Sequence, residues 1–367
     1  MGWWITIGLL LASASLVVSQ QPRLPNVTYT PTPWDGISQQ LIGFPPLGKI
    51  PINPLWTALV NTTGIPIGPL ASNVTGVGAE MWQGTTDHTY CSDKNTFGIT
   101  FDDGPGMYTT NLLNFLKSIN LKVTFFTIGV QIVQYPAVFK SIFDAGHQIG
   151  CHTWTHPWLT SLTNEQIIME TFWCEQAFQA VLGIRPVYMR PPHGDINPRV
   201  RSILIQMGYT IVEWTKDTND WRMSYDTTFQ GSWVTGNVSQ WIQQQKAGTL
   251  LPNGGGPILL EHDLWSQSAA LGPSVINLVR NAGFNIQRIG DCLGDPPANW
   301  YRNATVMPGF ATLPTPSPTQ SPIPSLQPTA EVVGTSVAPQ SSSGLYSAPL
   351  IVLIACVIVG LIFVIQL

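Results

Sequence analysis

Short apolar runs alternate with longer amphipathic stretches between Phe97 and about Leu293. The apolar runs have the length and the β-branched and aromatic content of buried strands; they are FGITF, KVTFFTI, HQIGC, PVYMR, TIVEW, PILLE and FNIQRI. The stretches between them predict helices, among them 109–119, 136–145, 164–182 and 198–207. This alternation predicts a parallel α/β sheet, and about seven strands with wide helical spacers favour a (β/α) barrel over an open, doubly wound sheet.

The segments on either side of this region lack sustained periodicity. Residues 20–85 are rich in Pro, Gly and glycosylation sequences, and we expect an irregular N-terminal region there. Residues 299–343 read as a stiff Ser/Thr/Pro-rich stalk. The catalytic domain is therefore expected to span 86–298.

Both ends of the chain are apolar. Residues 1–19 end in small residues and predict a cleaved secretory signal, although the usual basic start is missing and an uncleaved membrane anchor is the alternative. Within the expected C-terminal signal at 344–367, residues 350–367 are apolar to the last residue and lack flanking basic residues. With the small residues just before them, they predict a glycosylphosphatidylinositol (GPI) attachment signal that is removed on maturation, with the lipid at about Ser342. A simple tail anchor is the alternative.

The composition agrees with an extracellular location. Only 10% of residues are charged, against roughly 25% in an average soluble domain, and the net charge is −4. Nothing therefore suggests nucleic-acid binding or a basic surface for anionic lipid. Five sequons predict N-glycosylation; they are at Asn26, Asn61, Asn73, Asn237 and Asn303.

Four cysteines remain once Cys356 is removed with the C-terminal signal. An even number in an oxidising compartment predicts disulfides, and three pairings are possible. We favour Cys91–Cys292, which closes the two ends of the domain and leaves Cys151–Cys174.

Polar residues follow five of the predicted strands. In a parallel barrel the catalytic groups lie at the carboxyl ends of the strands, so these residues are expected to gather around one site. They are DDGP at 102–105, HTWTH at 152–156, RPPHG at 190–194, DTNDW at 217–221 and HD at 262–263.

Two of these segments predict a metal site. His152 and His156, with a carboxylate from a neighbouring strand, make a two-histidine, one-carboxylate set that zinc accepts and that non-haem iron also accepts. The extracellular context favours zinc. Water activated by the metal needs a base, so one of Asp102 and Asp103 would bind the metal and the other would take the proton, in either order. Successive strand residues face opposite ways, so we expect the strand to stop at Phe101.

The five motifs together resemble the polysaccharide deacetylases of the NodB-homology group, and fungal chitin deacetylases most closely. TFDDGP, HTWTH, RPPHG, DTNDW and LLEHD stand in the family's order between Thr96 and Leu293. The resemblance implies a distorted (β/α) barrel. It also implies that Asp102 is the general base and that Asp103, His152 and His156 hold zinc or cobalt.

The resemblance assigns roles to the remaining motif residues. Arg190 would orient the base, and the backbone N–H of His193 would help hold the oxyanion. His262 would be the general acid, positioned by Asp217 or Asp220. Trp221 would line the site near the acetyl group.

Two further features concern the sugar. We expect Trp265, with Trp221, to line the cleft, and most other tryptophans to pack in the core. Relatives often carry an aromatic residue where this chain has His193. That difference changes substrate preference if the side chain contacts sugar, and a role for His193 as an extra acid–base group is a third reading.

The implied activity is hydrolysis of N-acetyl groups on N-acetylglucosamine units of chitin, giving chitosan and acetate. The implied partners are chitin or another N-acetylglucosamine polymer, cell-wall glucan or chitin, and the plasma membrane through a GPI lipid; we expect a monomer. One alternative keeps the chemistry but takes acetylxylan or chitooligosaccharides. The other is a non-catalytic carbohydrate-binding wall protein.

Overall fold

The computed structural model describes residues 44–45, 50–66, 87–251 and 254–303. The predicted signal, the stalk, the GPI signal with Ser342, and the sequons at Asn26 and Asn73 lie outside these residues. Of the other sequons, Asn61 and Asn303 are exposed and Asn237 is half-buried. None of the helices in the described part is both long enough and apolar enough to cross a membrane.

The centre of the domain is a nine-stranded sheet with the order β1-β9-β2-β3-β4-β6-β7, in which β10 also pairs with β2 and β8 with β9. Its strands are β1 Tyr90–Cys91, β2 Thr96–Asp102, β3 Thr124–Thr127, β4 Gln148–Cys151, β6 Tyr188–Met189, β7 Thr210–Ile211, β8 Lys216–Asp217, β9 Gly256–His262 and β10 Asn285–Gln287. Only β1 runs antiparallel to its neighbour within this sheet. A separate antiparallel pair joins β5 Ile184–Pro186 to β11 Tyr301–Asn303.

The sheet curls so that its two edges meet. A single bridge pairs His88, just before β1, with Val212, just after β7. The His88 N–H donates to the carbonyl of Ile211, and the Glu213 N–H donates to the carbonyl of His88. The predicted distorted barrel is thus confirmed, with its closure made by this bridge and by the short pairing of β8, which follows β7 in the chain, with β9.

Each of the seven predicted apolar runs contains a strand, but the sheet has two strands that the pattern did not predict. These are β1 and β8, each of two residues. A segment that short shows no period-two alternation, so sequence pattern gives it no signal. The predicted strands are parallel to their neighbours among themselves, and the antiparallel strand β1 is an addition at the edge.

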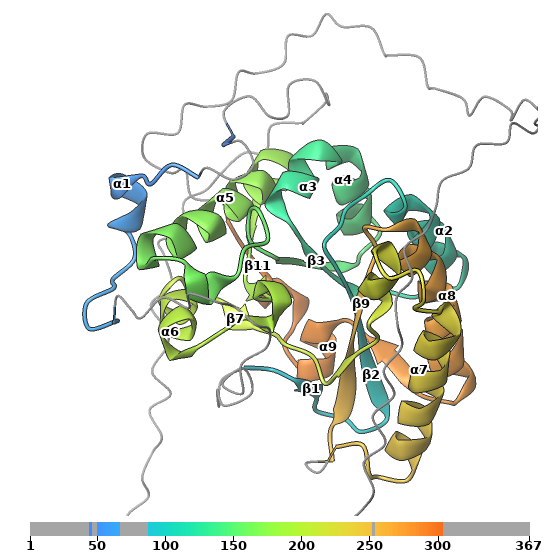
Figure 1. The fold of residues 1–367 in the computed structure, drawn as a ribbon. Helices are drawn as coiled ribbons and strands as arrows, with labels where there is room; N and C mark the ends of the chain where they lie inside the picture. Colours follow the sequence, from blue (N-terminus) through green and yellow to red (C-terminus); the bar gives the residue numbers. More distant parts are fainter. Residues whose placement is uncertain (1–43, 46–49, 67–86, 252–253, 304–367) are drawn as a thin grey trace, which may run out of the picture. The chain divides into compact units, whose positions relative to one another are not determined.

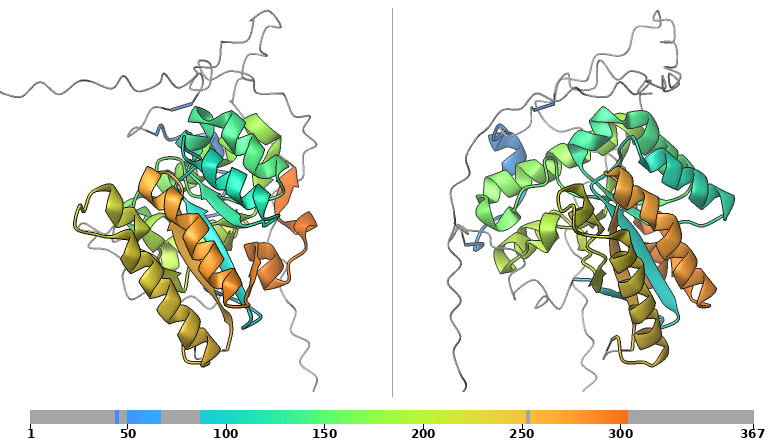
Figure 2. Two further views of the ribbon diagram at one scale, coloured as in Figure 1. Left: turned by 90° about the vertical axis from the view of Figure 1, so that its right-hand side faces the viewer. Right: turned by 45° about the vertical axis from the view of Figure 1, so that its right-hand side comes forward.

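Helices cover the outer face of the sheet (Figure 1). The bounds of the longer helices are α2 Thr109–Ser118, α4 Pro136–Asp144, α5 Asn164–Leu182, α6 Pro198–Gln206, α7 Gly231–Lys246 and α8 Ser266–Asn281. The shorter helices and 3₁₀ turns are α1 Pro54–Thr57, α3 Gly129–Gln134, α9 Ile289–Leu293, η2 Leu159–Ser161, η3 Pro192–Gly194, η4 Asp220–Ser224 and η5 Pro297–Asn299. Figure 2 shows α7 and α8 side by side next to β2.

Part of the predicted irregular N-terminal region packs against this layer. Trp56 of α1 is almost fully buried, and its ring lies 4.9 Å from that of Trp173 on α5. Phe44 stacks on Trp154 at 5.3 Å, in the loop after β4. The N-terminal segment therefore adds aromatic packing to the helix that lies behind the histidine loop.

Two disulfides join the elements, with the pairing that the sequence favoured. Cys91 of β1 is bonded to Cys292 of α9, and Cys151 of β4 to Cys174 of α5. The first closes the two ends of the domain. The second lies directly beside His152.

Candidate active site

The two longest strands set the proposed base opposite the proposed acid. β2 and β9 are parallel neighbours, and their register pairs Asp102 with His262. Paired residues of parallel strands present their side chains on the same face of the sheet. Both side chains are buried, at 1% and 8% exposure. The carboxyl ends of β2 and β9 therefore bring the two groups together without any loop between them.

The strand does not stop at Phe101, as the sequence led us to expect. β2 continues through Asp102, and the change of direction comes at Asp103, whose φ is +75°. This left-handed conformation breaks the alternation of side chains that a further strand residue would follow. Adjacent carboxylates can therefore serve one site.

Asp103, His152 and His156 are close enough to hold one metal ion, since one donor atom from each lies within 4.8 Å of the others. The Asp103 Oδ1 atom is 3.5 Å from Nε2 of His152 and 3.2 Å from Nε2 of His156. This oxygen is buried and has no hydrogen-bond partner. An unpaired buried carboxylate oxygen facing two imidazoles fits a cation at this point.

The histidines are prepared for the same role. The Nδ1 atom of His152 lies 2.7 Å from the carbonyl oxygen of Arg190, which fixes the ring and leaves Nε2 toward Asp103. Burial, together with the neighbouring His156, lowers the pKa of His152 well below its usual value. Burial likewise lowers the pKa of His156. Both rings are therefore neutral near pH 7, as metal ligands must be.

Arg190 holds the proposed base. This fully buried side chain donates from Nη1 to Asp102 Oδ1 at 2.8 Å and to the Thr100 hydroxyl, and its guanidinium lies 4.3 Å from the ring centre of Phe126. Burial raises the pKa of Asp102 to about 7, against the pull of Arg190. One carboxylate oxygen is thus fixed, and the group has the proton affinity of a base that works near neutral pH.

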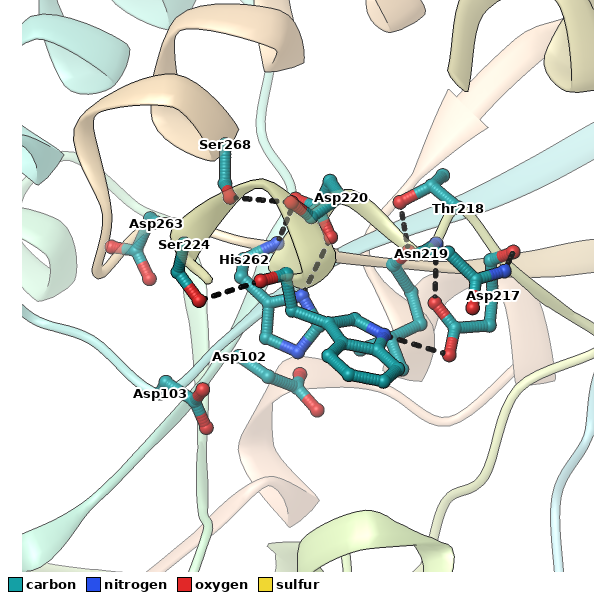
Figure 3. Close-up of polar contacts among 12 residues, drawn as sticks. Asp102, Asp103, Asp217, Thr218, Asn219, Asp220, Ser224, His262, Asp263 and Ser268 are labelled. Atoms are coloured by element: carbon teal, nitrogen blue, oxygen red, sulfur yellow. Dashed lines mark hydrogen bonds and ion pairs between the residues drawn. The ribbon is translucent and has the colours of Figure 1, made fainter. Parts of the chain in front are cut away.

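Asp220, and not Asp217, positions His262. Asp220 accepts from Nδ1 of the ring at 2.7 Å and from the His262 backbone N–H at 2.9 Å, and Figure 3 shows the ring between Asp220 and Asp102. Burial alone would lower the pKa of His262, but Asp220 and the site aspartates outweigh it and raise this pKa to about 10. Asp217 instead accepts from the indole N–H of Trp221 at 3.2 Å.

The remaining predicted residues flank the site. The ring of His193 lies 4.3 Å from that of His156 and stacks on Trp158 at 3.9 Å, while burial lowers its pKa to about 4. Trp265 lies 5.7 Å from the His262 ring. The structure thus places His193 on the metal side and Trp265 on the acid side; the oxyanion role of the His193 amide stays a prediction.

Two buried carboxylates that had no predicted role hold the loops from behind. Asp263 accepts from the Gly104 N–H at 3.2 Å and from the Thr109 hydroxyl at 2.5 Å, and a Cβ at position 104 would collide with it. Glu170 of α5 accepts from the backbone N–H groups of Trp154 and Thr155, both at 2.9 Å. Asp263 stood within a quoted motif, whereas the only sign of Glu170 was a charge in an apolar helix.

Most non-glycine residues with left-handed backbone in the described chain lie in these loops. Among non-glycine residues with positive φ, all but Asn120 belong to the five motifs; they are Asp103, Thr153, His156, His193 and Asn219. Such conformations are costly and persist where surrounding contacts enforce them, which is common at functional sites.

This combination of a curled parallel sheet, a two-histidine, one-aspartate set and an aspartate-paired histidine defines a class of metal-site hydrolases. The sequence pattern of the family described as polysaccharide deacetylase matches residues 89–212. The chain is 36% identical over 222 residues to a chitin deacetylase of a Pestalotiopsis species, and the match covers 59% of this chain and 69% of that relative. The protein therefore belongs to the polysaccharide deacetylase family.

Other relatives agree, with limits on coverage. The chain is 38% identical over 229 residues to chitin deacetylase 1 of Cryptococcus neoformans var. grubii, covering 59% of this chain but 47% of that relative. The solved structure of the chitin deacetylase from Colletotrichum lindemuthianum matches with a TM-score of 0.54 and 27% identity, over 60% of this chain and 97% of that one. The match thus covers about half of the Cryptococcus protein. It covers nearly all of the Colletotrichum chain.

Proposed function

We propose that this protein is a metal-dependent deacetylase that removes N-acetyl groups from N-acetylglucosamine units of chitin. The observation that carries the proposal is the β2–β9 register, which sets Asp102 opposite His262 beside the Asp103, His152 and His156 set. Relatives named chitin deacetylases support the choice of substrate.

The chain's own groups divide the proton transfers. Asp102, with one oxygen fixed by Arg190, takes a proton from the attacking water as the oxygen–carbon bond forms. His262, whose Nδ1 faces Asp220, gives its Nε2 proton to the departing nitrogen as the carbon–nitrogen bond breaks. The products are acetate and a free amine on the sugar. Zinc or cobalt bound to Asp103, His152 and His156 would supply Lewis-acid activation of the water and the carbonyl.

The proposed location is the outer face of the plasma membrane or the cell wall. The predicted secretory signal, stalk and GPI signal support it. Two disulfides within the domain are consistent with an oxidising compartment. Release of the full-length protein from intact cells by a phospholipase that cleaves GPI lipids would test this part of the proposal.

The activity is tested by acetate release from N-acetylglucosamine oligomers, with acetylated xylan as the competing substrate. Asp102→Asn should retain bound metal and lose acetate release by about a hundredfold or more, because the base is removed while the three ligands remain. Asp103→Asn should lose the metal as well. Near-normal turnover by Asp102→Asn would remove it as the base, and chelator-insensitive glycan binding without acetate release would favour a non-catalytic wall protein.

A further inference from the structure

The segment that follows the acid's partner carries exposed aromatic side chains. Asp220 begins η4, and the chain then runs through Tyr225 to Trp233 in the first turn of α7. Tyr225 is 65% exposed and Trp233 is 48% exposed. Within the described residues, the other aromatic side chain of comparable exposure is Tyr90, at 40%. Exposed apolar side chains that gather next to a site commonly mark a binding surface.

Tyr225 is connected to the active site through Trp221. Trp221 immediately follows Asp220, and its indole N–H donates to Asp217. The Trp221 ring lies 5.8 Å from that of Tyr225. The row of rings therefore starts at the residue beside the His262 partner and leads outward along η4.

The ring of Trp233 packs against side chains that hold it in place. Trp233 meets the buried ring of Phe229 edge to face at 5.3 Å, and the Arg222 guanidinium covers Phe229 at 4.8 Å. Arg222 is itself bonded to Asp226 at 2.8 Å. Side chains that are already held in place lose little conformational entropy when a ligand packs on them, so this surface is prepared for binding.

The surface suits a neutral, extended sugar chain. Pyranose units with equatorial substituents expose flat patches of C–H groups, and aromatic rings offer a flat apolar face with a negative quadrupole to such groups. The Arg222 charge, the one cation in this segment, is turned to Phe229 and Asp226, so nothing here selects an anionic partner. Because the proposed reaction acts on one sugar of a polymer, its neighbouring sugars must lie on the rim of the site.

We propose that Tyr225 and Trp233 bind sugar units of the same chain, beyond the unit whose acetamide reacts, and so make the protein selective for long chains. This inference rests on the proposed deacetylase function. It adds a polymer-binding surface on the acid side of the site, formed by η4 and the start of α7.

The test compares Tyr225→Ala, Trp233→Ala and the double variant with wild type on the N-acetylglucosamine dimer and on colloidal chitin, both of which are neutral. We expect the double variant to lose about tenfold in kcat/KM on the polymer, as for two weak aromatic contacts, and markedly less on the dimer. The matched control is Tyr90→Ala, an exposed aromatic on β1, beside the amino end of β9. It should keep the wild-type ratio of the two rates.

A second measurement separates this inference from the proposed chemistry. Adsorption of the Asp102→Asn protein to chitin needs no turnover, and adding the double substitution should weaken that adsorption about tenfold. The polymer surface would be overturned by equal losses of kcat/KM on the sugar dimer and the polymer, or by unchanged adsorption. It would also be overturned if the wild-type protein were a dimer and the double variant a monomer, because the aromatic side chains would then form a protein interface. Absence of acetate release with intact, aromatic-dependent adsorption would instead overturn the deacetylase function alone.

Discussion

At the scale of single residues, the site depends on giving similar groups different partners. Asp102 faces Arg190, while the adjacent Asp103 leaves an unpaired oxygen toward two imidazoles. Asp220 accepts from His262, while Asp217, three residues earlier, accepts from Trp221. The sequence identified these groups, but it left Asp217 and Asp220 as alternatives. The choice depends on where β8 ends and η4 begins, which residue spacing does not fix.

The Asp220–His262 pair predicts a change in pH dependence. The folded pKa of His262 is raised to about 10 from a usual value of 6.5, so the pair stabilises the folded protein fully below pH 6.5 and loses this contribution as the pH rises through 10. Asp220→Asn removes the carboxylate that most opposes the effect of burial. The alkaline limb of kcat/KM should therefore move to lower pH, and the loss of stability should be largest below pH 6.5 and shrink as the pH rises toward 10.

A pH–rate profile with acetate as the readout checks this prediction. Asp217→Asn is the matched control, because this aspartate makes no hydrogen bond to the ring and its loss should leave the alkaline limb in place. An unshifted limb in Asp220→Asn, or the same shift in both variants, would contradict the assignment of Asp220.

At the scale of elements, buried carboxylates fix the loops that carry the ligands. Asp263, next to His262 in sequence, holds the turn after Asp103. Glu170 reaches from α5 to the loop between the two histidine ligands. These contacts join elements that are far apart in the chain or not adjacent in the sheet. Sequence spacing alone does not reveal them.

Glu170→Gln should weaken metal binding. The amide keeps one acceptor oxygen but cannot accept both backbone N–H groups and the Thr155 hydroxyl, so the loop between His152 and His156 loosens. Loss of a supporting contact around a metal site typically costs about 10–100-fold in affinity. Competition with a zinc-binding dye would measure the change. Glu175→Gln is the control, because this buried glutamate on the same helix pairs with Arg185 and Tyr209 instead.

An equal metal affinity in Glu170→Gln and wild type would show that the loop holds its shape without this contact. A similar loss in Glu175→Gln would point to the stability of α5 as a whole. Thermal unfolding of both variants distinguishes these outcomes, because each removes one buried charged partner.

The elements also show how far periodicity reaches. The helix predicted at 164–182 has those bounds in α5, which begins with a capping box at Thr163 and Gln166 and ends at the left-handed Gly183. These end signals are local, so the sequence carries them. The contacts that close the barrel are the His88–Val212 bridge and the two-residue pairing of β8 with β9. They are short and join residues far apart in the chain, so the sequence predicted closure only from the number of strands.

At the scale of the whole molecule, the Cys91–Cys292 disulfide ties together two segments that are 201 residues apart. Cys91 pairs in β1 with Gly256, at the amino end of β9, whereas His262 lies at the carboxyl end of that strand. The bond therefore acts on the closure of the domain at the end opposite the proposed chemistry. Its contribution should be to stability, mainly by restricting the unfolded chain.

Replacing Cys91 and Cys292 together by Ser should lower the free energy of unfolding by about 2–5 kcal/mol and leave metal affinity unchanged below the melting temperature. The control removes Cys151 and Cys174, which are 23 residues apart. The shorter loop should cost about 2 kcal/mol less on the chain-entropy account. Because Cys151 precedes His152, this control should also lower metal affinity. Denaturant unfolding and zinc competition measure both effects, and equal metal affinity in the two double variants would show that the Cys151–Cys174 bond has no part in placing His152.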